Sequence, residues 1–459
     1  MRRAAHLTLA LTILLLAVFY HAGATEHART VNTSRVRADQ SGYLWDAVGI
    51  HIARHGGPST LIGERNRMPV YPWLLSWLYD PAMTPDAFFD TAKRWNILLS
   101  LVLLGLLAGI ARLMLPPLPA INLVLVVAFG YYVFKAGYAQ AELLFYFLFL
   151  STFLVCCRLL QEHTARRTFV LAVVAGSLAA LTHLTKAAVL PFVGVFLAVL
   201  AVRALAPLTR LRSAADPDER TLVTRVVLYR LAAGAVFTVC FLGLLSPYLI
   251  NSKTHFGRYF YNVNSTFYVW YDDWPSASVG TYQDGDGKGW PTTPPDQIPS
   301  MRKYLREHSA AQIAQRFGNG FLEMITVSYN RLWYFKYGVL YGLFALLMIS
   351  TAWHSFLGLI HSRAAVFSFL LLYGVVYLAA VAFYQPISGT TLRMLLAHLA
   401  PFLFVVSRLS ARPPFRDLRW NLGGAIVTPG HIHLLILVMM AFDLVFVHWR
   451  RLMADFAGY

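Results

Sequence analysis

Charged side chains are scarce in this sequence. Only 13% of its 459 residues are Asp, Glu, Lys or Arg, whereas 57% are hydrophobic. A soluble globular domain carries about a quarter charged residues, so this composition excludes a water-soluble fold. The apolar residues form long continuous runs and not short alternating segments, which favours membrane helices over a β-barrel. The sequence therefore predicts an all-α integral membrane protein.

Cysteine is also scarce, and several common motifs are missing. The three cysteines, Cys156, Cys157 and Cys240, lie inside apolar runs, which excludes a disulfide framework and a cysteine metal site. We find no internal repeat and no glycine-rich phosphate-binding motif.

We predict about eleven membrane spans, interrupted by two long hydrophilic segments. A basic start followed by an apolar stretch also fits a cleaved signal peptide, but we favour a retained first span because ten more follow. In chain order we expect a first span at 1–24, a hydrophilic segment at 25–95, spans 2–7 within 96–250, a second hydrophilic segment at 251–335 and spans 8–11 within 336–459. The spans after the first are expected at 96–113, 119–134, 141–157, 168–184, 187–205, 229–250, 336–353, 365–384, 391–408 and 431–448.

The distribution of charge predicts the orientation of these spans. With the N-terminus inside, the short inner connections hold 17 basic and 5 acidic residues, whereas each long segment holds 8 basic and 7 acidic. This asymmetry agrees with the positive-inside rule, although Arg450 and Arg451 fall outside. The net charge of +17 is thus explained by topology, and nucleic acid is not an expected partner. Both long segments are expected on the outer face, and at about 70 and 85 residues they are too long to be mere connections.

The first long segment contains the stretch RADQSGYLWDAVGIHIARHGG, whose spacing predicts a helix that ends at Gly56 and Gly57. Asp39 lies at its start. Its carboxylate is placed either to cap the helix or to act as a general base at the membrane surface, and the local sequence leaves both open. Asp46, seven residues later, is a candidate second acid.

Several cations and one carboxylate are placed to bind an anionic substrate. Arg67 precedes a Pro-x-x-Pro turn and an aromatic-rich interfacial helix, where it can bind a lipid phosphate or simply contact phospholipid. Glu142, Lys186 and Arg393 lie at the ends of spans, where ionisable groups are costly. Lys186 can alternatively snorkel, and Arg393 is expected to bind phosphate or to pair with a loop carboxylate. His398, deeper in the same span as Arg393, is interpreted as an interior histidine with its hydrogen bonds satisfied.

Metal-binding patterns are weak. His51 and His55 have i, i+4 spacing without an HExxH arrangement, and Asp284 and Asp286 do not match a calcium-binding loop. We therefore predict no metal site, although a divalent-cation requirement stays open. The stretch from Asp272 to Pro299 is expected to be irregular, followed by a helix over 299–317.

In order along the chain, these segments resemble the GT-C superfamily of polytopic glycosyltransferases, in the branch of dolichyl-phosphate-mannose protein mannosyltransferases and lipid A aminoarabinose transferases. The similarity begins with an acidic loop after the first span and continues with short motifs over nearly the whole chain. The matching elements are Asp39 with Tyr43 to Ala47; Arg67, Pro69, Tyr71 and Pro72; Ala141 and Glu142; Leu184 to Lys186; the stretch SPYLINSKTHFGRYF, which contains Arg258; and Arg393 with Pro401. One departure is that Gln40 follows Asp39, where the family often has a paired Asp-Glu.

The resemblance implies an inverting transfer of a sugar from a polyprenyl-phosphate donor to a lipid, glycan or protein on the outer face of a membrane. Since the polyprenyl phosphate itself leaves, no nucleotide cofactor is expected, which agrees with the missing glycine-rich motifs. The resemblance also implies Asp39 as base, with Lys186, Arg393 and either Arg67 or Arg258 at the donor phosphate. Because Gln40 follows Asp39, a second acid comes from Asp46, from elsewhere in the chain or not at all. Tyr71 and Glu142 are carried over as substrate-binding positions. The compact loops favour a bacterial inner membrane, with the active site facing the periplasm and membrane lipids around it.

Two other classes of membrane protein remain open from the sequence. An O-antigen polymerase or ligase also has many spans and a large outer loop. The acidic loop directly after the first span of this chain is the feature that favours a GT-C-like enzyme over that class. A transporter usually shows an internal repeat and charges midway through its spans.

Overall fold

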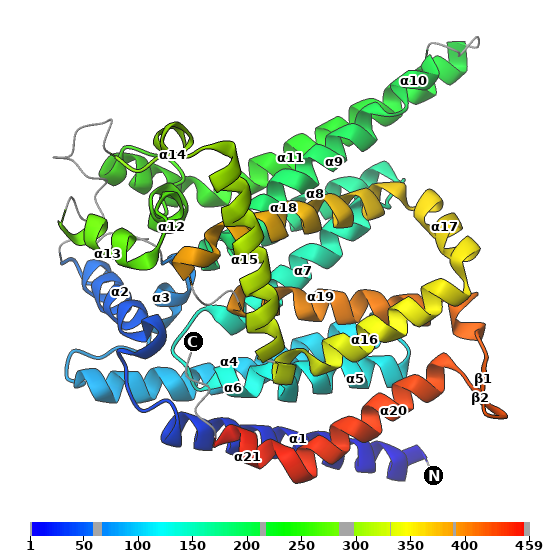
Figure 1. Ribbon diagram of the computed structural model, residues 1–459, viewed down its shortest axis with the longest axis horizontal. Coiled ribbons are helices and arrows are strands. Elements are labelled where there is room, and N and C mark those ends of the chain that lie inside the picture. The colour runs from blue at the N-terminus through cyan, green and yellow to red at the C-terminus, as the bar shows by residue number, and fades with distance from the viewer. Residues whose placement is uncertain are drawn as a thin grey trace.

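The computed structural model describes residues 2–57, 67–211, 217–283, 298–330, 332–388 and 392–453 (Figure 1). In these residues the chain is helical apart from one small hairpin, in which β1 (Trp420–Leu422) pairs antiparallel with β2 (Ala425–Val427). Gly423 and Gly424 form its two-residue turn with φ of 59° and 88°, values that glycine adopts without strain. The expectation of a helical chain is confirmed.

The helices of the first half extend from the N-terminus to the long α11. They are α1 (Arg2–Thr30), α2 (Gln40–Arg54), α3 (Val70–Leu75), α4 (Pro85–Met114), α5 (Pro117–Val127), α6 (Val133–Ala136), α7 (Glu142–Leu159), α8 (Ala165–Thr185), α9 (Leu190–Leu205), α10 (Leu208–Leu211) and α11 (Pro217–Phe256). A π-helical turn, Ala128–Tyr132, joins α5 to α6, and short 3-10 turns precede α2 and α9 at Arg37–Asp39 and Ala187–Val189.

The second half begins with short helices and ends with long ones. They are α12 (Val263–Thr266), α13 (Trp274–Gln283), α14 (Met301–Glu307), α15 (Ala310–Asn330), α16 (Leu332–Thr351), α17 (Trp353–Ser362), α18 (Ala364–Ser388), α19 (Leu392–Ser410), α20 (Pro429–Phe442) and α21 (His448–Leu452). Further short turns lie at Tyr268–Trp270, Phe415–Asp417 and Asp443–Val447.

Among the described residues, nine helices are long and apolar enough to cross a membrane, or ten if α16 and α17, bent by 98° at their junction, count as one span. These ten coincide with the ten spans predicted after the first. The first predicted span lies within α1, which is not among the ten, and the side chains of residues 1–10 lie outside the described part. The chain is thus suited to a membrane, and the total of eleven spans stays a prediction.

Several helices continue well beyond the apolar windows that predicted them. α4 begins at Pro85, inside the predicted loop, because the Thr84 hydroxyl accepts a hydrogen bond from the Ala87 N–H and proline occupies the first turn. α1 reaches Thr30, and α11 has 40 residues where a span of 229–250 was expected. Hydropathy locates the apolar part of a helix, whereas capping and helix propensity decide where the helix ends.

The elements of the two long hydrophilic segments lie together in Figure 1. α2, α3, α12, α13 and α14 gather at one end of the molecule, which we call the loop end. The N-terminus of α1, the α16–α17 bend and the β1–β2 hairpin lie at the other, which we call the N-terminal end. This placement agrees with the predicted threading, in which both segments share one side.

Within the loop end, two expectations need correction. The stretch expected to be irregular contains α13, and the helix expected over 299–317 is two helices, α14 and α15, which break at His308 and Ser309. Ser300 caps α14, and Ser309 forms a second cap with Gln312, so the sequence begins a new helix there. Residues 284–297, with Asp284 and Asp286, lie outside the described residues.

One close contact sets the packing of the spans next to the site. α8 lies against α11, and a Cβ added to Gly176 on α8 would lie 2.4 Å from the carbonyl oxygen of Phe237 on α11. Only glycine allows these backbones to approach so closely, a common device in membrane helix pairs. The crossing fixes α8, whose C-terminal end carries Lys186.

Candidate functional site: a carboxylate and cation cluster at the loop end

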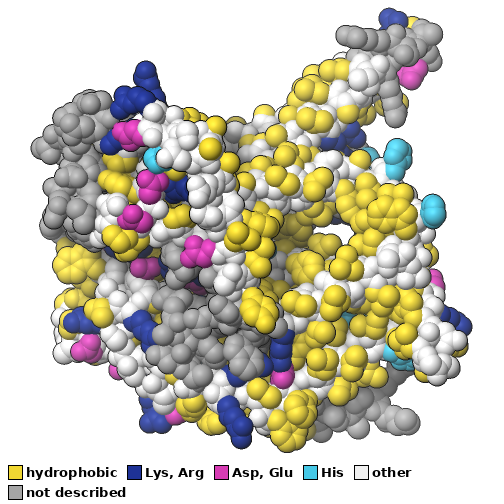
Figure 2. All heavy atoms as spheres, in the orientation of Figure 1, with side chains coloured by type: hydrophobic (Ala, Val, Ile, Leu, Met, Phe, Trp, Pro, Cys, Tyr) yellow, Lys and Arg dark blue, Asp and Glu magenta, His cyan; other side chains and the backbone are white. Residues whose placement is uncertain are grey.

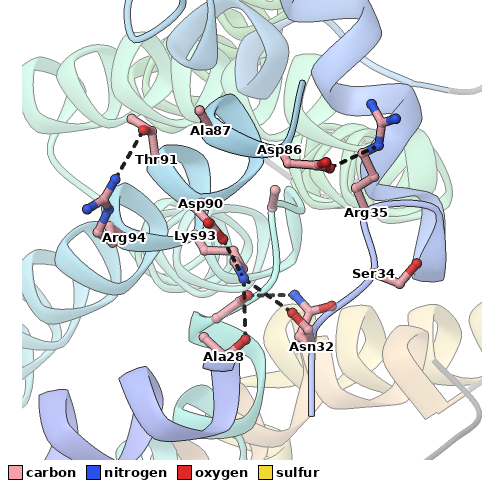
Figure 3. Close-up of polar contacts among 12 residues, drawn as sticks. Ala28, Asn32, Ser34, Arg35, Asp86, Ala87, Asp90, Thr91, Lys93 and Arg94 are labelled. Carbon is pink, nitrogen blue, oxygen red and sulfur yellow. Dashed lines mark hydrogen bonds and ion pairs between the residues drawn. The ribbon is translucent and has the colours of Figure 1, made fainter. Parts of the chain in front are cut away.

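The end of α1 and the segment that joins α1 to α2 and ends at Asp39 are tied to α4 by polar contacts (Figure 3). The ammonium of Lys93 on α4 donates to the carbonyls of Ala28 and Asn32, at 3.4 and 3.3 Å, and pairs with Asp90 at 2.9 Å. Lys93 is only 9% exposed, so its charge would be costly without these partners. The segment is therefore held in one place relative to the spans.

Asn32 and Gln40 hold the other side of this segment. Their side-chain amides exchange hydrogen bonds of 2.8 Å, both residues are fully buried, and Asn32 also donates to the Gly137 carbonyl at 2.7 Å. Gln40 further accepts from the Ala139 N–H at 2.9 Å. The residue that departs from the family's Asp-Glu pair is thus a buried structural amide, and it does not supply a second acid.

The backbone turns sharply at Asp39. Ala38 and Asp39 both have left-handed conformations, with φ of 58° and 68°, which are unfavourable by about 1–2 kcal/mol per residue for side chains other than glycine. The Gln140 amide donates to the Ala38 carbonyl and supports the turn. Asp39 occupies the N-cap position of α2, but its side chain makes no capping hydrogen bond. Of the two interpretations of Asp39, the helix cap is not observed.

Asp39 instead pairs with a residue far along the chain. Its Oδ2 lies 3.0 Å from NH1 of Arg393 at the start of α19, and its side chain is half exposed. The same NH1 lies 3.8 Å from Oε1 of Glu142, the first residue of α7. The Tyr146 hydroxyl donates to the Arg393 carbonyl at 2.9 Å and so links α7 to α19.

Lys186 completes the group. Its ammonium lies 2.9 Å from Oε1 of Glu142, whose side chain is only 2% exposed. Asp39, Glu142, Lys186 and Arg393, which we call the cluster, therefore come from four separate segments and alternate in charge. The second carboxylate oxygen of Glu142 is buried and has no hydrogen-bond partner among the described residues. Apolar side chains of similar volume are often at least as stable as a buried ion pair, so stability alone does not explain these charges. Buried ionisable groups of this kind are common at functional sites.

Asp46 and Arg67 form a second ion pair beside the cluster, at 2.7 Å between Oδ2 and Nε. Burial lowers the pKa of Arg67, but the nearby Asp46 carboxylate more than offsets this and the pKa is raised. Tyr43 and Tyr71 pack edge to face at 5.4 Å between ring centroids, with the Tyr71 hydroxyl bonded to Asn96. Burial, followed by the negative charge of Glu142, raises the pKa of Tyr43 well above its usual value, so this phenol stays protonated.

Lys135 is a functional candidate that the sequence reasoning missed. It is 2% exposed at the end of α6, where it interacts electrostatically with Glu142, Arg393 and Lys186. Lys135 directly follows the predicted span 119–134. A lysine at the end of an apolar span was the feature that identified Lys186 as a candidate, and the same feature could have identified Lys135. The cluster therefore has a third basic side chain beside it.

Arg258 and His398, which the sequence singled out, contact residues outside the cluster. The guanidinium of Arg258 lies 5.5 Å from the ring centroid of Phe267, a residue outside the cluster. His398 is satisfied as expected, since one ring nitrogen lies 2.6 Å from the Tyr373 hydroxyl and the other 3.1 Å from the Met394 carbonyl.

The part of the chain that the structure describes contains no group of three or more His, Cys, Asp or Glu side chains that could hold a metal ion. His51 and His55 stack with ring centroids 4.2 Å apart, and the Nδ1 atom of each lies near a backbone carbonyl, that of Ser76 and that of His51.

Comparison with known proteins identifies no relative. No family model, no curated protein and no solved structure matches this chain. Function must therefore be argued from the cluster itself.

Proposed function

We propose that this protein is a membrane glycosyltransferase that moves a sugar from a polyprenyl-phosphate donor to a hydroxyl of a lipid, glycan or protein acceptor. The observation that supports this most is the meeting of Asp39 with Arg393 and Lys186 around Glu142. A carboxylate that is half exposed beside fixed cations is what sugar transfer from a lipid phosphate requires.

In the proposed reaction, the acceptor oxygen attacks the anomeric carbon and its proton passes to Asp39. The bond between the anomeric carbon and the phosphate oxygen breaks, and the configuration at that carbon inverts. The phosphodiester donor has one negative charge and the departing polyprenyl phosphate has two. Arg393 and Lys186 stabilise the added charge, because cations positioned in advance act most strongly where water is scarce.

The ion pair between Asp39 and Arg393 suggests an order of events. While the pair is intact, Oδ2 of Asp39 is occupied by the Arg393 guanidinium and is not free to accept a hydrogen bond from the sugar acceptor's hydroxyl. When the donor phosphate binds Arg393, it competes with Asp39 for the guanidinium and frees the carboxylate for the acceptor. Donor binding would thus activate the base. Glu142 would keep Arg393 and Lys186 at the spacing that a phosphate occupies.

The supporting residues fit this assignment. Asp46 and Arg67 would hold the acceptor or the outer side of the donor phosphate, and Tyr43 would donate a hydrogen bond as a neutral phenol. Arg258 is the weakest of the predicted phosphate ligands because its guanidinium faces Phe267. The proposal places the reaction at the loop end, on the periplasmic face of a bacterial inner membrane.

The proposal is tested with purified protein in proteoliposomes and a panel of radiolabelled polyprenyl-phosphate sugars. We expect transfer from one donor to an extractable acceptor, with an anomeric configuration in the product opposite to that of the donor. Retained configuration would contradict the mechanism. Transfer of a whole lipid-linked glycan would favour the polymerase or ligase, and uptake of solute without transfer would favour a transporter.

A further inference from the structure

A second polar constellation lies at the N-terminal end, opposite the cluster. Four arginines surround the mouth of a cavity between α7, α17, α18 and α19: Arg158, Arg363, Arg408 and Arg412. The cavity has a volume of about 200 Å³, and its walls are mainly apolar. Figure 2 shows an opening in this region of the molecule, bordered by hydrophobic side chains.

Three of these four arginines lack a carboxylate partner among the described residues. Arg158 lies 3.5 Å from Glu162, but among the described residues no acidic side chain is within ion-pair distance of Arg363, Arg408 or Arg412. The Arg363 guanidinium donates to the Gln161 side chain and that of Arg408 to the Met114 carbonyl, both neutral acceptors. The mouth of the cavity therefore carries a surplus of positive charge.

The positive charges crowd one another. Partial burial, followed by the charges of Arg363 and Arg408, lowers the pKa of Arg412 to about 10. Burial, followed by Arg408 and Arg158, also lowers the pKa of Arg363. Like charges held together in this way are unfavourable in the empty protein, and a bound anion would relieve the repulsion.

The shape of the site narrows the class of anion. Below the arginines the walls are apolar, with Phe153, Leu154, Leu370 and Phe404 among them, and two of these four side chains, on α7 and α19, are buried. A free phosphate would use the guanidiniums and leave these walls unoccupied. A helix about 10 Å wide could not enter a space of this volume, whereas a stretch of alkyl chain could. A charged head joined to an alkyl tail matches both parts.

We propose that this arginine-rimmed cavity binds one anionic phospholipid, with its phosphate on Arg363, Arg408 and Arg412 and an acyl chain in the cavity. A second cavity next to it is lined by Arg158, Arg166 and Arg167 together with one carboxylate, Glu162, so its charged lining is net positive and extends the basic surface that a headgroup would meet. Anionic lipids bind such basic pockets between membrane helices. The inference does not depend on the proposed glycosyl transfer.

The test is native mass spectrometry of the purified protein, titrated separately with phosphatidylglycerol and phosphatidylcholine. We expect one tightly bound phosphatidylglycerol, with at least about tenfold lower affinity in Arg363→Gln/Arg412→Gln because two charge-assisted contacts are lost. The matched control is Arg220→Gln/Arg225→Gln, which removes the same charge from exposed positions on α11 and should bind as the wild type does.

A second variant separates this site from a general effect of charge or misfolding. Leu370→Trp keeps all four arginines but fills part of the cavity, and it should lower the affinity for phosphatidylglycerol while the melting temperature of lipid-free protein is unchanged. Glycerophosphoglycerol, which has the headgroup without chains, should not displace the lipid. Equal affinity for both lipids, an equal loss in the control pair, unchanged binding in Leu370→Trp or displacement by the headgroup alone would overturn the proposal.

Discussion

The guanidinium of Arg67 lies directly against Gly42, in the space that a side chain at that position would fill. A Cβ at Gly42 would be 2.2 Å from NH1 of Arg67 and 2.8 Å from its Nε, the atom that contacts Asp46. Gly42 lies on the first turn of α2, three residues after Asp39. The missing side chain therefore lets the Asp46–Arg67 pair form beside the proposed base.

Gly42→Ala should weaken activity without changing any charge. The flexible end of Arg67 would move to avoid the new methyl group and lose its contact with Asp46, and we expect a decrease of about tenfold in kcat/KM, the loss of one charge-assisted hydrogen bond. Steady-state transfer assays of Gly42→Ala, Arg67→Met and the double variant measure this. If both changes act through the same ion pair, the double variant should be no worse than Arg67→Met, and additive losses would contradict that coupling.

Glu142 should be important for stability as well as for the site. Glu142→Gln leaves the partly buried Lys186 and Arg393 without their shared carboxylate, and breaking such a pair typically costs about 3–5 kcal/mol. Urea unfolding in mild detergent should show a lower midpoint for Glu142→Gln. The double variant Glu142→Gln/Lys186→Met should recover part of the loss. Equal stability of the wild type, the single variant and the double variant would show that the Glu142–Lys186 pair does not contribute to the free energy of unfolding.

Arg393→Lys should not be a conservative change. One guanidinium nitrogen of Arg393 lies near both Asp39 and Glu142, which leaves the other N–H groups of the guanidinium for a donor phosphate. A lysine ammonium is a single point charge and offers no second nitrogen for that contact. We expect a decrease in kcat of at least about tenfold, from the loss of one charge-assisted contact at the leaving phosphate. Lys303→Arg on α14, outside the cluster, is the control and should keep full activity.

The α8–α11 crossing gives a prediction about folding alone. Gly176→Ala places a methyl group against the Phe237 carbonyl and should destabilise the protein by about 1–3 kcal/mol through overpacking. Gly243→Ala is matched to it, because a Cβ there meets nothing within 4 Å. Thermal unfolding should show a lower transition temperature for Gly176→Ala only; a similar decrease in both would contradict the close approach.

Tyr43 should contribute to a loss of stability at alkaline pH. Its pKa in the folded protein is raised by burial and by Glu142, so above pH 10 the unfolded chain releases the phenol proton while the folded chain retains it. Unfolding is then favoured as the pH rises, by up to about 1.4 kcal/mol per pH unit from this group. Unfolding free energies between pH 9 and 11 should fall less steeply for Tyr43→Phe, and identical slopes would contradict the assignment.

The sequence predicted the kinds of residue in the site better than their pairing. Glu142, Lys186 and Arg393 were visible because ionisable groups at the ends of apolar spans are rare. That Asp39 would meet Arg393, 354 positions later, depends on how the spans pack, which local patterns do not encode. Lys135 was overlooked because its apolar neighbours resemble an ordinary span end, and only its burial at 2% exposure distinguishes it.

The positions of the apolar helices could be predicted from the local sequence, but the residues at which those helices begin and end could not. Continuous apolar runs located ten helices because each run must fill the thickness of a bilayer. Hydropathy could not place the ends of α4 or α11, nor the break between α14 and α15, because caps and polar helix formers set them. Backbone strain at Ala38 and Asp39 was equally hidden, since it depends on contacts from Gln140 and Arg393.

The most direct test of the central claim compares Asp39→Asn with Asp86→Asn in the same transfer assay, together with donor binding. Asp86 is an exposed carboxylate on α4 that pairs only with Arg35, at 3.4 Å, among the described residues. We predict that Asp39→Asn binds the polyprenyl-phosphate sugar at least as tightly as the wild type, because Arg393 is no longer shared. Transfer should be at least about 100-fold slower, because the base is lost. Asp86→Asn should behave as the wild type. Unimpaired transfer by folded Asp39→Asn would contradict the account.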